Sequence, residues 1–176
     1  NDLSNTPSIS ADGHYVTFQT QATDTGVGAE GNGTGFDVFR VSLVAGAGAD
    51  RMIGSDGNDS IDGLAGDDIL LGGFGNDVLT GGAGADQISG AAGTDTADYS
   101  GSAAGVTVDL VLGTGVGGDA QGDTLSGVEN LTGSAQADHL YGDAGANTLT
   151  GGDGDDTLRG GAGADVIAGG NGSDYA

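Results

Sequence analysis

One apolar residue returns every nine residues along two long stretches of the chain. Because neighbouring side chains of an extended segment face opposite ways, each such residue predicts a three-residue β-strand with its middle side chain turned inward. The other six residues of each period predict a turn. Two units would complete one coil, so like units would lie eighteen residues apart on neighbouring coils. The inward positions are Ile61, Leu70, Leu79, Ile88 and Ala97 in the first stretch and Leu140, Leu149, Leu158 and Ile167 in the second.

Glycine and aspartate follow the same period. In the first stretch a glycine stands at Gly54 and then at every ninth residue, with a second glycine three places later and an aspartate two places after that. The unit at residues 72–80 reads GGFGNDVLT, and the second stretch, from Gly133, departs from the pattern at Gln136 and Asn147. Because glycine accepts positive φ without a Cβ clash, six residues can turn tightly and point their main-chain carbonyl groups at a common centre.

The segments outside the two runs follow other patterns. Residues 8–20 alternate as in a hairpin and residues 36–44 as in a third strand, which together predict one small antiparallel sheet. Gly133 lies 79 residues after Gly54, which is not a multiple of nine, so the second run cannot simply continue the first. An insertion that interrupts one roll and a connector between two rolls both fit. The predicted domains are a small antiparallel β-sheet at 1–50, a first roll at 51–98, a β-rich insertion or connector at 99–132 and a second roll, broken off mid-unit, at 133–176.

Composition changes this picture in one respect. Forty glycines, four Phe, four Tyr and no Trp cannot build an ordinary core, and a net charge of −23 repels itself. Composition alone therefore predicts a disordered chain, and we expect disorder in the metal-free state. With three basic residues and no lysine, the chain lacks the clusters that bind nucleic acid or an anionic membrane surface, and no stretch is long enough for a membrane span. Cations are the natural partners.

Stacked coils would bring these aspartates together. Strands in neighbouring coils lie about 4.8 Å apart, so Asp59 would neighbour Asp77, and Asp77 would neighbour Asp95. Without a cation these carboxylates would repel one another. A gap that offers two carboxylates and several carbonyl oxygens is an all-oxygen cage of flexible geometry, which suits Ca²⁺ better than Zn²⁺ or Mg²⁺.

The units resemble the G-G-x-G-x-D-x-U-x repeats of the RTX family. The resemblance implies an all-β fold, a calcium-loaded parallel β-roll (β-solenoid) in two repeat runs, with several Ca²⁺ ions, about six, as cofactor. A neutral oxygen at Asn147 predicts the weakest site, and Gln136 puts a non-glycine residue into the turn beside Asp138. The implied side-chain ligands are Asp59, Asp68, Asp77, Asp86, Asp95, Asp138, Asn147, Asp156, Asp165 and Asp174. The implied loop carbonyls are those of Gly57, Gly66, Gly75, Gly84, Gly93, Gly145, Gly154, Gly163 and Gly172.

By the same resemblance, the function is calcium binding and calcium-dependent folding in a structural, non-enzymatic module of a secreted or cell-surface bacterial protein. Such proteins are exported by type I secretion, with a signal at the extreme C-terminus, which would lie beyond this chain. Residues 7–44 also resemble a single blade of a TolB-like β-propeller, either as a lone cap or as the last blade of a ring.

Two other functions stay open at this point. The chain could be the C-terminal accessory region of an extracellular enzyme, such as a polysaccharide lyase or epimerase, a lipase or a protease. It could also be a self-assembling surface-layer or filament component, so self-association and a surface glycan are further candidate partners. No catalytic residue is indicated, since His14 and His139 stand apart and neither an H-E-x-x-H nor a G-x-S-x-G motif occurs. The glycines at 113, 115 and 118 match a dinucleotide fingerprint but precede a turn rather than a helix.

Overall fold

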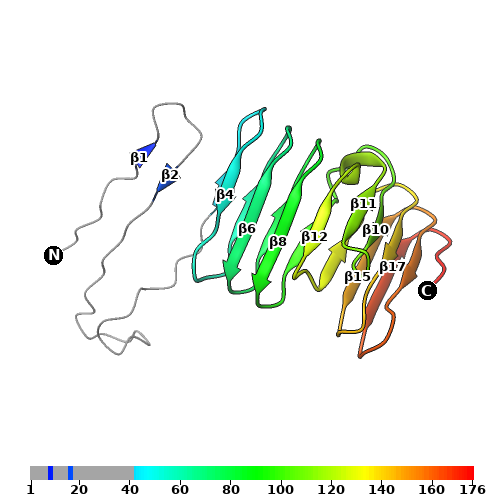
Figure 1. Cartoon of the computed structure of the whole chain (residues 1–176). Coiled ribbons are helices and arrows are strands. Elements are labelled where there is room, and N and C mark those ends of the chain that lie inside the picture. Colours follow the sequence, from blue (N-terminus) through cyan, green and yellow to red (C-terminus); the bar gives the residue numbers. More distant parts are fainter. Residues whose placement is uncertain (1–7, 10–15, 18–41) are drawn as a thin grey trace, which may run out of the picture.

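The computed structural model describes residues 8–9, 16–17 and 42–176 (Figure 1). Strands β1 (Ser8–Ile9) and β2 (Val16–Thr17) pair antiparallel, as expected for the N-terminal hairpin. The rest of the small sheet and most of the propeller-like segment 7–44 lie outside the described residues, so the resemblance to a propeller blade stays a prediction.

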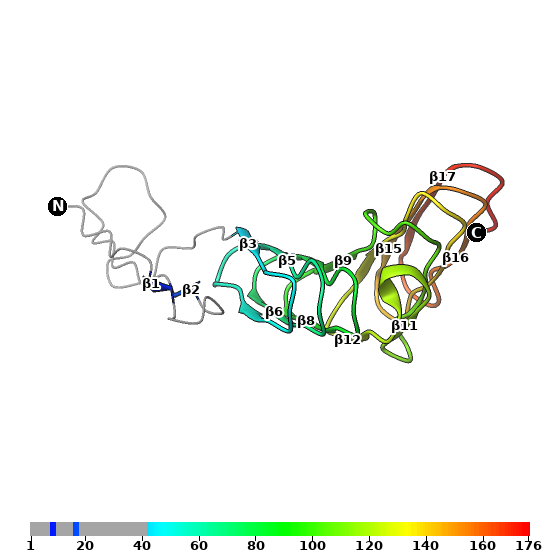
Figure 2. The same cartoon turned by 90° about the horizontal axis from the view of Figure 1, so that it is seen from above.

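Two sheets face each other and form the walls of a roll (Figure 2). The seven-stranded sheet consists, in chain order, of β3 (Ser42–Val44), β5 (Ser60–Asp62), β7 (Val78–Thr80), β9 (Thr96–Asp98), β13 (Asn130–Thr132), β15 (Thr148–Asp153) and β17 (Val166–Asn171). The eight-stranded sheet consists of β4 (Arg51–Ile53), β6 (Ile69–Phe74), β8 (Gln87–Ala92), β10 (Thr107–Asp109), β11 (Thr114–Val116), β12 (Thr124–Ser126), β14 (His139–Tyr141) and β16 (Thr157–Arg159). The one helix of the described residues is the short 3₁₀ helix η1 (Gly118–Ala120).

The register of the sheets is the eighteen-residue register that the repeats predict. Ile61 lies opposite Leu79 in the seven-stranded sheet, and Leu70 lies opposite Ile88 in the eight-stranded sheet, in parallel pairs. Successive nonapeptides thus enter the two sheets alternately, and two of them complete a coil. The all-β parallel β-roll predicted from the repeats is confirmed.

The predicted inward residues form the core, with one exception. Eight of the nine are buried, at 0–2 % exposure, and line the narrow interior between the sheets. Ile167 is wrong as a core residue because its side chain is 38 % exposed. It lies on β17, an edge strand of its sheet, so no neighbouring coil covers its outer side.

The last residues of the third strand predicted for the N-terminal sheet, 42–44, belong to the roll instead. Residues 42–44 form β3, which pairs parallel with β5 and so belongs to the roll. The pairing joins Leu43 to Ile61, eighteen residues later, which is the register of a repeat unit. The roll therefore begins before residue 51, because strand pairing in this register continues where the glycine pattern has already faded.

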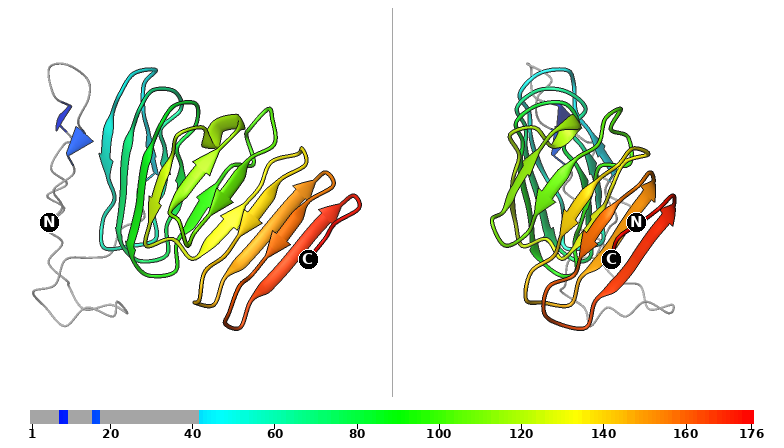
Figure 3. Two further views of the ribbon diagram at one scale, coloured as in Figure 1. Left: turned by 45° about the vertical axis from the view of Figure 1, so that its right-hand side comes forward. Right: turned by 90° about the vertical axis from the view of Figure 1, so that its right-hand side faces the viewer.

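The segment between the two runs is inserted into one wall of the roll. Strands β12 and β13 continue the sheets directly after β8 and β9, with Leu125 opposite Ile88 and Leu131 opposite Ala97. The antiparallel pair β10–β11 enters the eight-stranded sheet between β12 and β14, whereas β13 and β15 are direct neighbours in the other sheet. The insertion therefore adds two strands, β10 and β11, to one wall only, and the later coils run at an angle to the earlier ones (Figure 3).

Candidate metal centre

The acidic residues of the repeats lie at the two turn edges of the roll, each directly before a strand. We call the residues that precede the seven-stranded sheet the first column and those that precede the eight-stranded sheet the second column. The first column consists of Asp59, Asp77, Asp95, Glu129, Asn147 and Asp165. The second column consists of Asp50, Asp68, Asp86, Asp123, Asp138, Asp156 and Asp174.

A regular hydrogen-bond ladder joins successive members of each column up to the insertion, and again after it. The main-chain N–H of Asp59 donates to Oδ1 of Asp77 at 2.8 Å, and that of Asp77 donates to Oδ1 of Asp95 at 2.8 Å. In the second column, the N–H of Asp68 donates to Oδ1 of Asp86 at 2.8 Å. Each carboxylate is thus fixed by one oxygen to the coil before it, as the predicted neighbour relation of these aspartates requires.

The second carboxylate oxygen has no such partner. Oδ2 of Asp68, Asp77, Asp86, Asp95 and Asp156 is buried and accepts no hydrogen bond. Burying a carboxylate oxygen without a partner costs several kcal/mol, and native structures rarely leave such an atom unpaired. Because the same unpartnered oxygen occurs five times, we infer that a cation completes each site.

Carbonyl oxygens converge on the same place. A Cβ atom added to Gly72 would lie closer than 3.0 Å to both Oδ2 of Asp77 and the carbonyl oxygen of Gly90, in the next coil. The same pair of contacts recurs at Gly63 and Gly133. At these positions the first glycine of the unit therefore leaves open a cradle between coils into which a carboxylate oxygen and a carbonyl oxygen both point, and any side chain would close it.

The second set of predicted oxygens also lies between stacked turns. The carbonyl of Gly57 points along the stack toward the next coil. A Cβ added to Gly75, in that coil, would therefore lie 2.6 Å from the Gly57 carbonyl oxygen. The carbonyls of Gly66, Gly75, Gly145 and Gly154 face the corresponding glycines 84, 93, 163 and 172 in the same way. These positions fit the predicted loop ligands.

This donor set fits Ca²⁺. Within residues 42–176 and the two short strands before them, no three His, Cys, Asp or Glu side chains gather closely enough to hold a metal by themselves. A site here must therefore combine one or two carboxylates with main-chain carbonyls. Ca²⁺ accepts such mixed oxygen ligands in flexible geometry, whereas Zn²⁺ prefers nitrogen and sulfur and Mg²⁺ demands a stricter octahedron.

The electrostatics of the metal-free columns are unfavourable at neutral pH. Burial raises the pKa of the Asp68, Asp77, Asp95 and Asp156 carboxyls, and neighbouring aspartates in the columns raise those of Asp68, Asp77 and Asp156 further. Burial raises the pKa of Asp86 to about 7, with smaller contributions from the negative charges of Asp123 and Asp68. Carboxylates that are desolvated and repelled in this way are stabilised by a bound cation.

In two other aspartates, Asp59 and Asp138, a serine of the same turn donates to the carboxylate, so Oδ2 has a hydrogen-bond partner. The hydroxyl and N–H of Ser55 both donate to the carboxylate of Asp59, and those of Ser134 donate to Asp138, the N–H to Oδ2 at 2.6 Å. In both units serine stands directly after the first glycine. The carbonyl of Gln136 still faces Gly154, as glycine carbonyls do elsewhere, so the main chain keeps the turn geometry that the sequence put in doubt.

Asn147 is held entirely by protein groups. Its Oδ1 accepts from the N–H of Asp143 at 2.9 Å, its Nδ2 donates to the carbonyl of Glu129 at 2.8 Å, and its N–H donates to Oδ1 of Asp165 at 3.0 Å. An amide with both ends engaged has less to offer a metal than a carboxylate. The last acids are more open than the others, since Asp165 is half-buried and Asp174 is exposed.

Three members of the columns were missed by sequence reasoning. Asp50 belongs to a unit at 45–53 whose first glycine is replaced by Ala45, and its N–H donates to Oδ1 of Asp68 at 2.7 Å. Asp123 and Glu129 lie in the insertion, where the nine-residue period is lost. The signal for Asp50 was its spacing of nine residues from Asp59, and the signal for Asp123 was the Asp-Thr-Leu sequence that Asp156 also begins.

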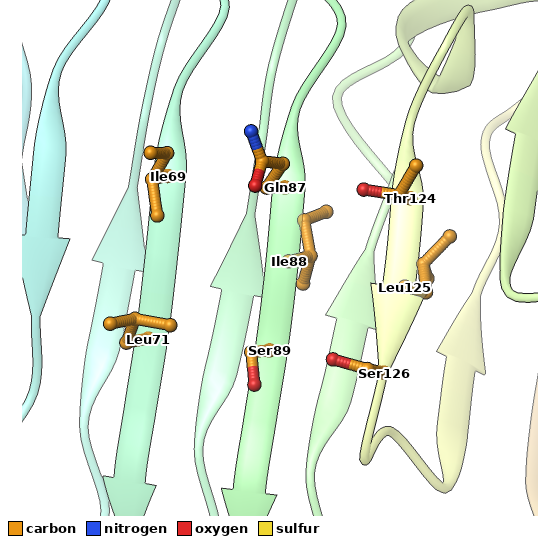
Figure 4. Close-up of a pocket in the computed structure, with 8 residues that line it drawn as sticks. All are labelled: Ile69, Leu71, Gln87, Ile88, Ser89, Thr124, Leu125 and Ser126. Carbon is orange, nitrogen blue, oxygen red and sulfur yellow. The ribbon is translucent and has the colours of Figure 1, made fainter.

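Other features of the described residues lack the charged side chains or the helix that a further binding site would need. A shallow hollow on the eight-stranded sheet is lined by Ile69, Leu71, Gln87, Ile88, Ser89, Thr124, Leu125 and Ser126, none of them charged (Figure 4). His139 is exposed, and Gly118 opens only the three-residue helix η1, so the dinucleotide fingerprint is not followed by the helix it needs. None of the described helices has the length and apolar character needed to cross a membrane.

Comparison with known proteins agrees with this geometry. The sequence profile of the RTX calcium-binding nonapeptide repeat matches the chain four times, at residues 44–79, 62–97, 123–157 and 141–176. These matches cover more than half of the chain and include every member of both columns. A comparison with curated proteins returned no match.

Proposed function

The chain belongs to the RTX calcium-binding nonapeptide repeat family, and we propose that its β-roll is a structural module that folds as it binds Ca²⁺. The observation that supports this proposal is the row of buried Oδ2 atoms without a hydrogen-bond partner in Asp68, Asp77, Asp86, Asp95 and Asp156. A cation between the coils would give each of these atoms a ligand and would cancel the repulsion along the columns.

Coupling between binding and folding follows from where the ligands come from. The cradle at Gly72 combines Asp77 in one coil with the Gly90 carbonyl in the next, so it exists only when the two coils are stacked. An ion that binds the folded chain and not the unfolded chain stabilises folding by about 1.4 kcal/mol at a tenfold excess over its Kd. Several such sites in a chain with a one-residue-wide core would decide whether the roll forms.

The test compares the size of the chain in chelator and in Ca²⁺. We expect the radius of gyration to fall by roughly two- to threefold when Ca²⁺ is added, since unfolded chains of this length are larger than compact ones by about that factor. Mg²⁺ at the same concentration should produce little contraction. The proposal is wrong if the radius in chelator already equals the radius in Ca²⁺.

A pair of matched variants assigns the effect to the columns. Asp77→Asn removes a charge from a buried column member, and Asp56→Asn removes the same charge from an exposed turn residue. Asp77→Asn should raise the Ca²⁺ concentration needed for contraction, whereas Asp56→Asn should leave it within about twofold of the original. Equal shifts in the two variants would show that net charge, not site geometry, controls folding.

Export is the finer part of the proposal. A chain that folds only with Ca²⁺ would stay unfolded in a calcium-poor cytoplasm, pass through a type I secretion channel and fold outside the cell. With a C-terminal type I signal attached and its transporter present, export should drop when cytoplasmic Ca²⁺ is raised to the folding range. Unchanged export at that concentration would contradict this route. The accessory-region and self-assembly roles stay predictions.

A further inference from the structure

The coil that closes the insertion departs from the nonapeptide on both edges of the roll. Residues 127–132 read GVENLT, so only six residues, instead of nine, span from the first glycine to the end of the strand. Glu129 stands directly before β13, where every complete unit has Asp or Asn. On the other edge, Asp123 stands directly before β12, after the 3₁₀ helix η1.

In the first column, the longer side chain of Glu129 makes up for the shorter turn. Its Oε2 accepts from the N–H of Asp95 at 2.8 Å, which is the contact that Asp95 itself makes with Asp77. The carbonyl of Gly127 and Oδ2 of Asp95 both lie closer than 3.0 Å to the Cβ position of Gly90, so the cradle is complete. Asp95 is fully buried, and its Oδ2 has no partner.

In the second column, the hydroxyl of Tyr99 contacts the carboxylate of Asp123. Asp123 accepts from the N–H of Asp86 with Oδ1 and from the hydroxyl of Tyr99 with Oδ2, both at 2.9 Å. The Tyr99 side chain is only 2 % exposed, so this hydroxyl is a fixed internal group. Both carboxylate oxygens of Asp123 are therefore engaged by protein donors, unlike those of Asp68, Asp77, Asp86, Asp95 and Asp156.

The second cradle also lacks the close carbonyl that the other cradles have. The three atoms nearest to the Cβ position of Gly81 all belong to Asp86, the farthest at 3.1 Å, whereas at Gly63, Gly72 and Gly90 a carbonyl from the next coil lies within 3.0 Å. Oδ2 of Asp86 is buried here without a partner, and Oδ2 of Asp123, the nearest column member of the next coil, is already engaged by Tyr99.

We propose that this coil binds Ca²⁺ on one edge only: Glu129, Asp95 and the Gly127 carbonyl hold an ion in the first column, and the Tyr99 hydroxyl takes the place of an ion at Asp123 in the second. This inference rests on the proposed calcium function. The first column then carries metal across the junction between the two repeat runs, while the second column is divided into two separate sets of ions.

Native mass spectrometry at saturating Ca²⁺ tests the two halves with three matched variants. Glu129→Gln, Asp123→Asn and Asp77→Asn each replace a carboxylate with an amide that keeps an oxygen to accept the ladder hydrogen bond. We expect fewer bound ions in Glu129→Gln and in Asp77→Asn, and the original number in Asp123→Asn. Circular dichroism at the same Ca²⁺ concentration checks that each variant has the strand signal of the unchanged chain.

The outcomes separate this inference from the proposed function. If Asp77→Asn loses an ion but Glu129→Gln does not, Glu129 is not a ligand and the first half is overturned. Loss of an ion in Asp123→Asn overturns the second half. If Asp77→Asn itself loses none, the calcium function of the columns fails.

A measurement on the unchanged chain does not depend on any variant folding. Crystals grown with Tb³⁺ in place of Ca²⁺ should show an anomalous peak between Asp95 and Glu129 and none between Asp86 and Asp123. A peak at the second place, or its absence at the first while Asp77 carries one, contradicts the proposal.

Discussion

The main-chain N–H of Asn76 donates to Oδ1 of Asn58, one coil earlier, at 2.8 Å. Asn76 in turn accepts from the N–H of Thr94 at 3.0 Å, and Ala85 and Ser173 donate in the same way to Asp67 and Asp155. Where the residue directly before a column member is Asn or Asp, as at Asn58, Asn76, Asp67 and Asp155, it adds a rung to a second ladder beside the first.

Removing one rung of this outer ladder should weaken the calcium-loaded roll. Asn76→Ala deletes the acceptor for Thr94, and a hydrogen bond of this kind contributes about 1 kcal/mol to stability. Thr94→Ala is the matched control, because Thr94 supplies only its N–H to this contact. Thermal unfolding in excess Ca²⁺ should show a lower Tm for Asn76→Ala and an unchanged Tm for Thr94→Ala. Equal values for both variants would contradict a stabilising role of the outer ladder.

Two side chains occupy turn positions that favour glycine. Leu64 and Ala91 have φ of 67° and 76°, and both stand directly after the first glycine of a unit, where Gly73 and Gly82 also have positive φ. Left-handed backbone costs a residue with a Cβ roughly 1–2 kcal/mol. Ala91→Gly should therefore raise the Tm in Ca²⁺, and Gly73→Ala should lower it, since a Cβ there would also press on the Ser55 carbonyl. A lower Tm for Ala91→Gly would refute the strain.

The buried phenol of Tyr99 should stabilise the insertion. Tyr99→Phe leaves Oδ2 of Asp123 without its donor in a buried place, which costs about 1–3 kcal/mol. Tyr175, which is 75 % exposed, provides the control substitution Tyr175→Phe. Urea unfolding in excess Ca²⁺ should show a lower midpoint for Tyr99→Phe alone. If the two variants unfold at the same midpoint, the Tyr99 hydroxyl does not stabilise the fold.

Acid should favour the metal-free roll and oppose the calcium-loaded one. A carboxyl with a higher pKa in the folded chain binds its proton more tightly when folded. It therefore stabilises the metal-free fold below its unfolded pKa, and this stabilisation is lost as the pH rises through the folded pKa. Burial and the charges nearby raise the pKa of Asp86 from 3.8 to about 7, and burial raises that of Asp123 from 3.8 to about 6.

Strand content in chelator should thus be higher near pH 4 than near pH 8, with the loss between these values. The Ca²⁺ affinity should change in the opposite direction, because protons compete with the ion for the same carboxylates. Circular dichroism and calcium titrations at several pH values measure both trends. A Ca²⁺ affinity that rises toward acid pH would contradict the assignment of these carboxylates to the metal.

The nine-residue period predicted the roll well because one inward side chain and one turn acid per unit determine both the register and the core. Ile61 and Asp59 therefore lie where the pattern places them. Where another residue or contact keeps the same register, the nine-residue pattern is absent and did not predict it. Glu129 reaches the ladder from a turn three residues shorter, and β3 joins the roll through backbone pairing that needs no glycine.

The insertion shows the limit of sequence reasoning most clearly. A strand at Thr107–Asp109 could be predicted from alternating residues, but not that it would pair with β14, thirty-two residues away. Nor could the sequence show that Tyr99 would meet Asp123, since such a contact depends on how the chain folds back between β9 and β12. Exposure of Ile167 likewise follows from the position of β17 at a sheet edge and not from its own unit.

Far-UV circular dichroism during a calcium titration, started in chelator at neutral pH, tests most directly whether ions between the coils hold the roll together. The account predicts a largely disordered signal in chelator and a cooperative gain of strand signal as Ca²⁺ is added, reversed by renewed chelation. A strand signal that is complete in chelator and unaltered by Ca²⁺ would contradict it.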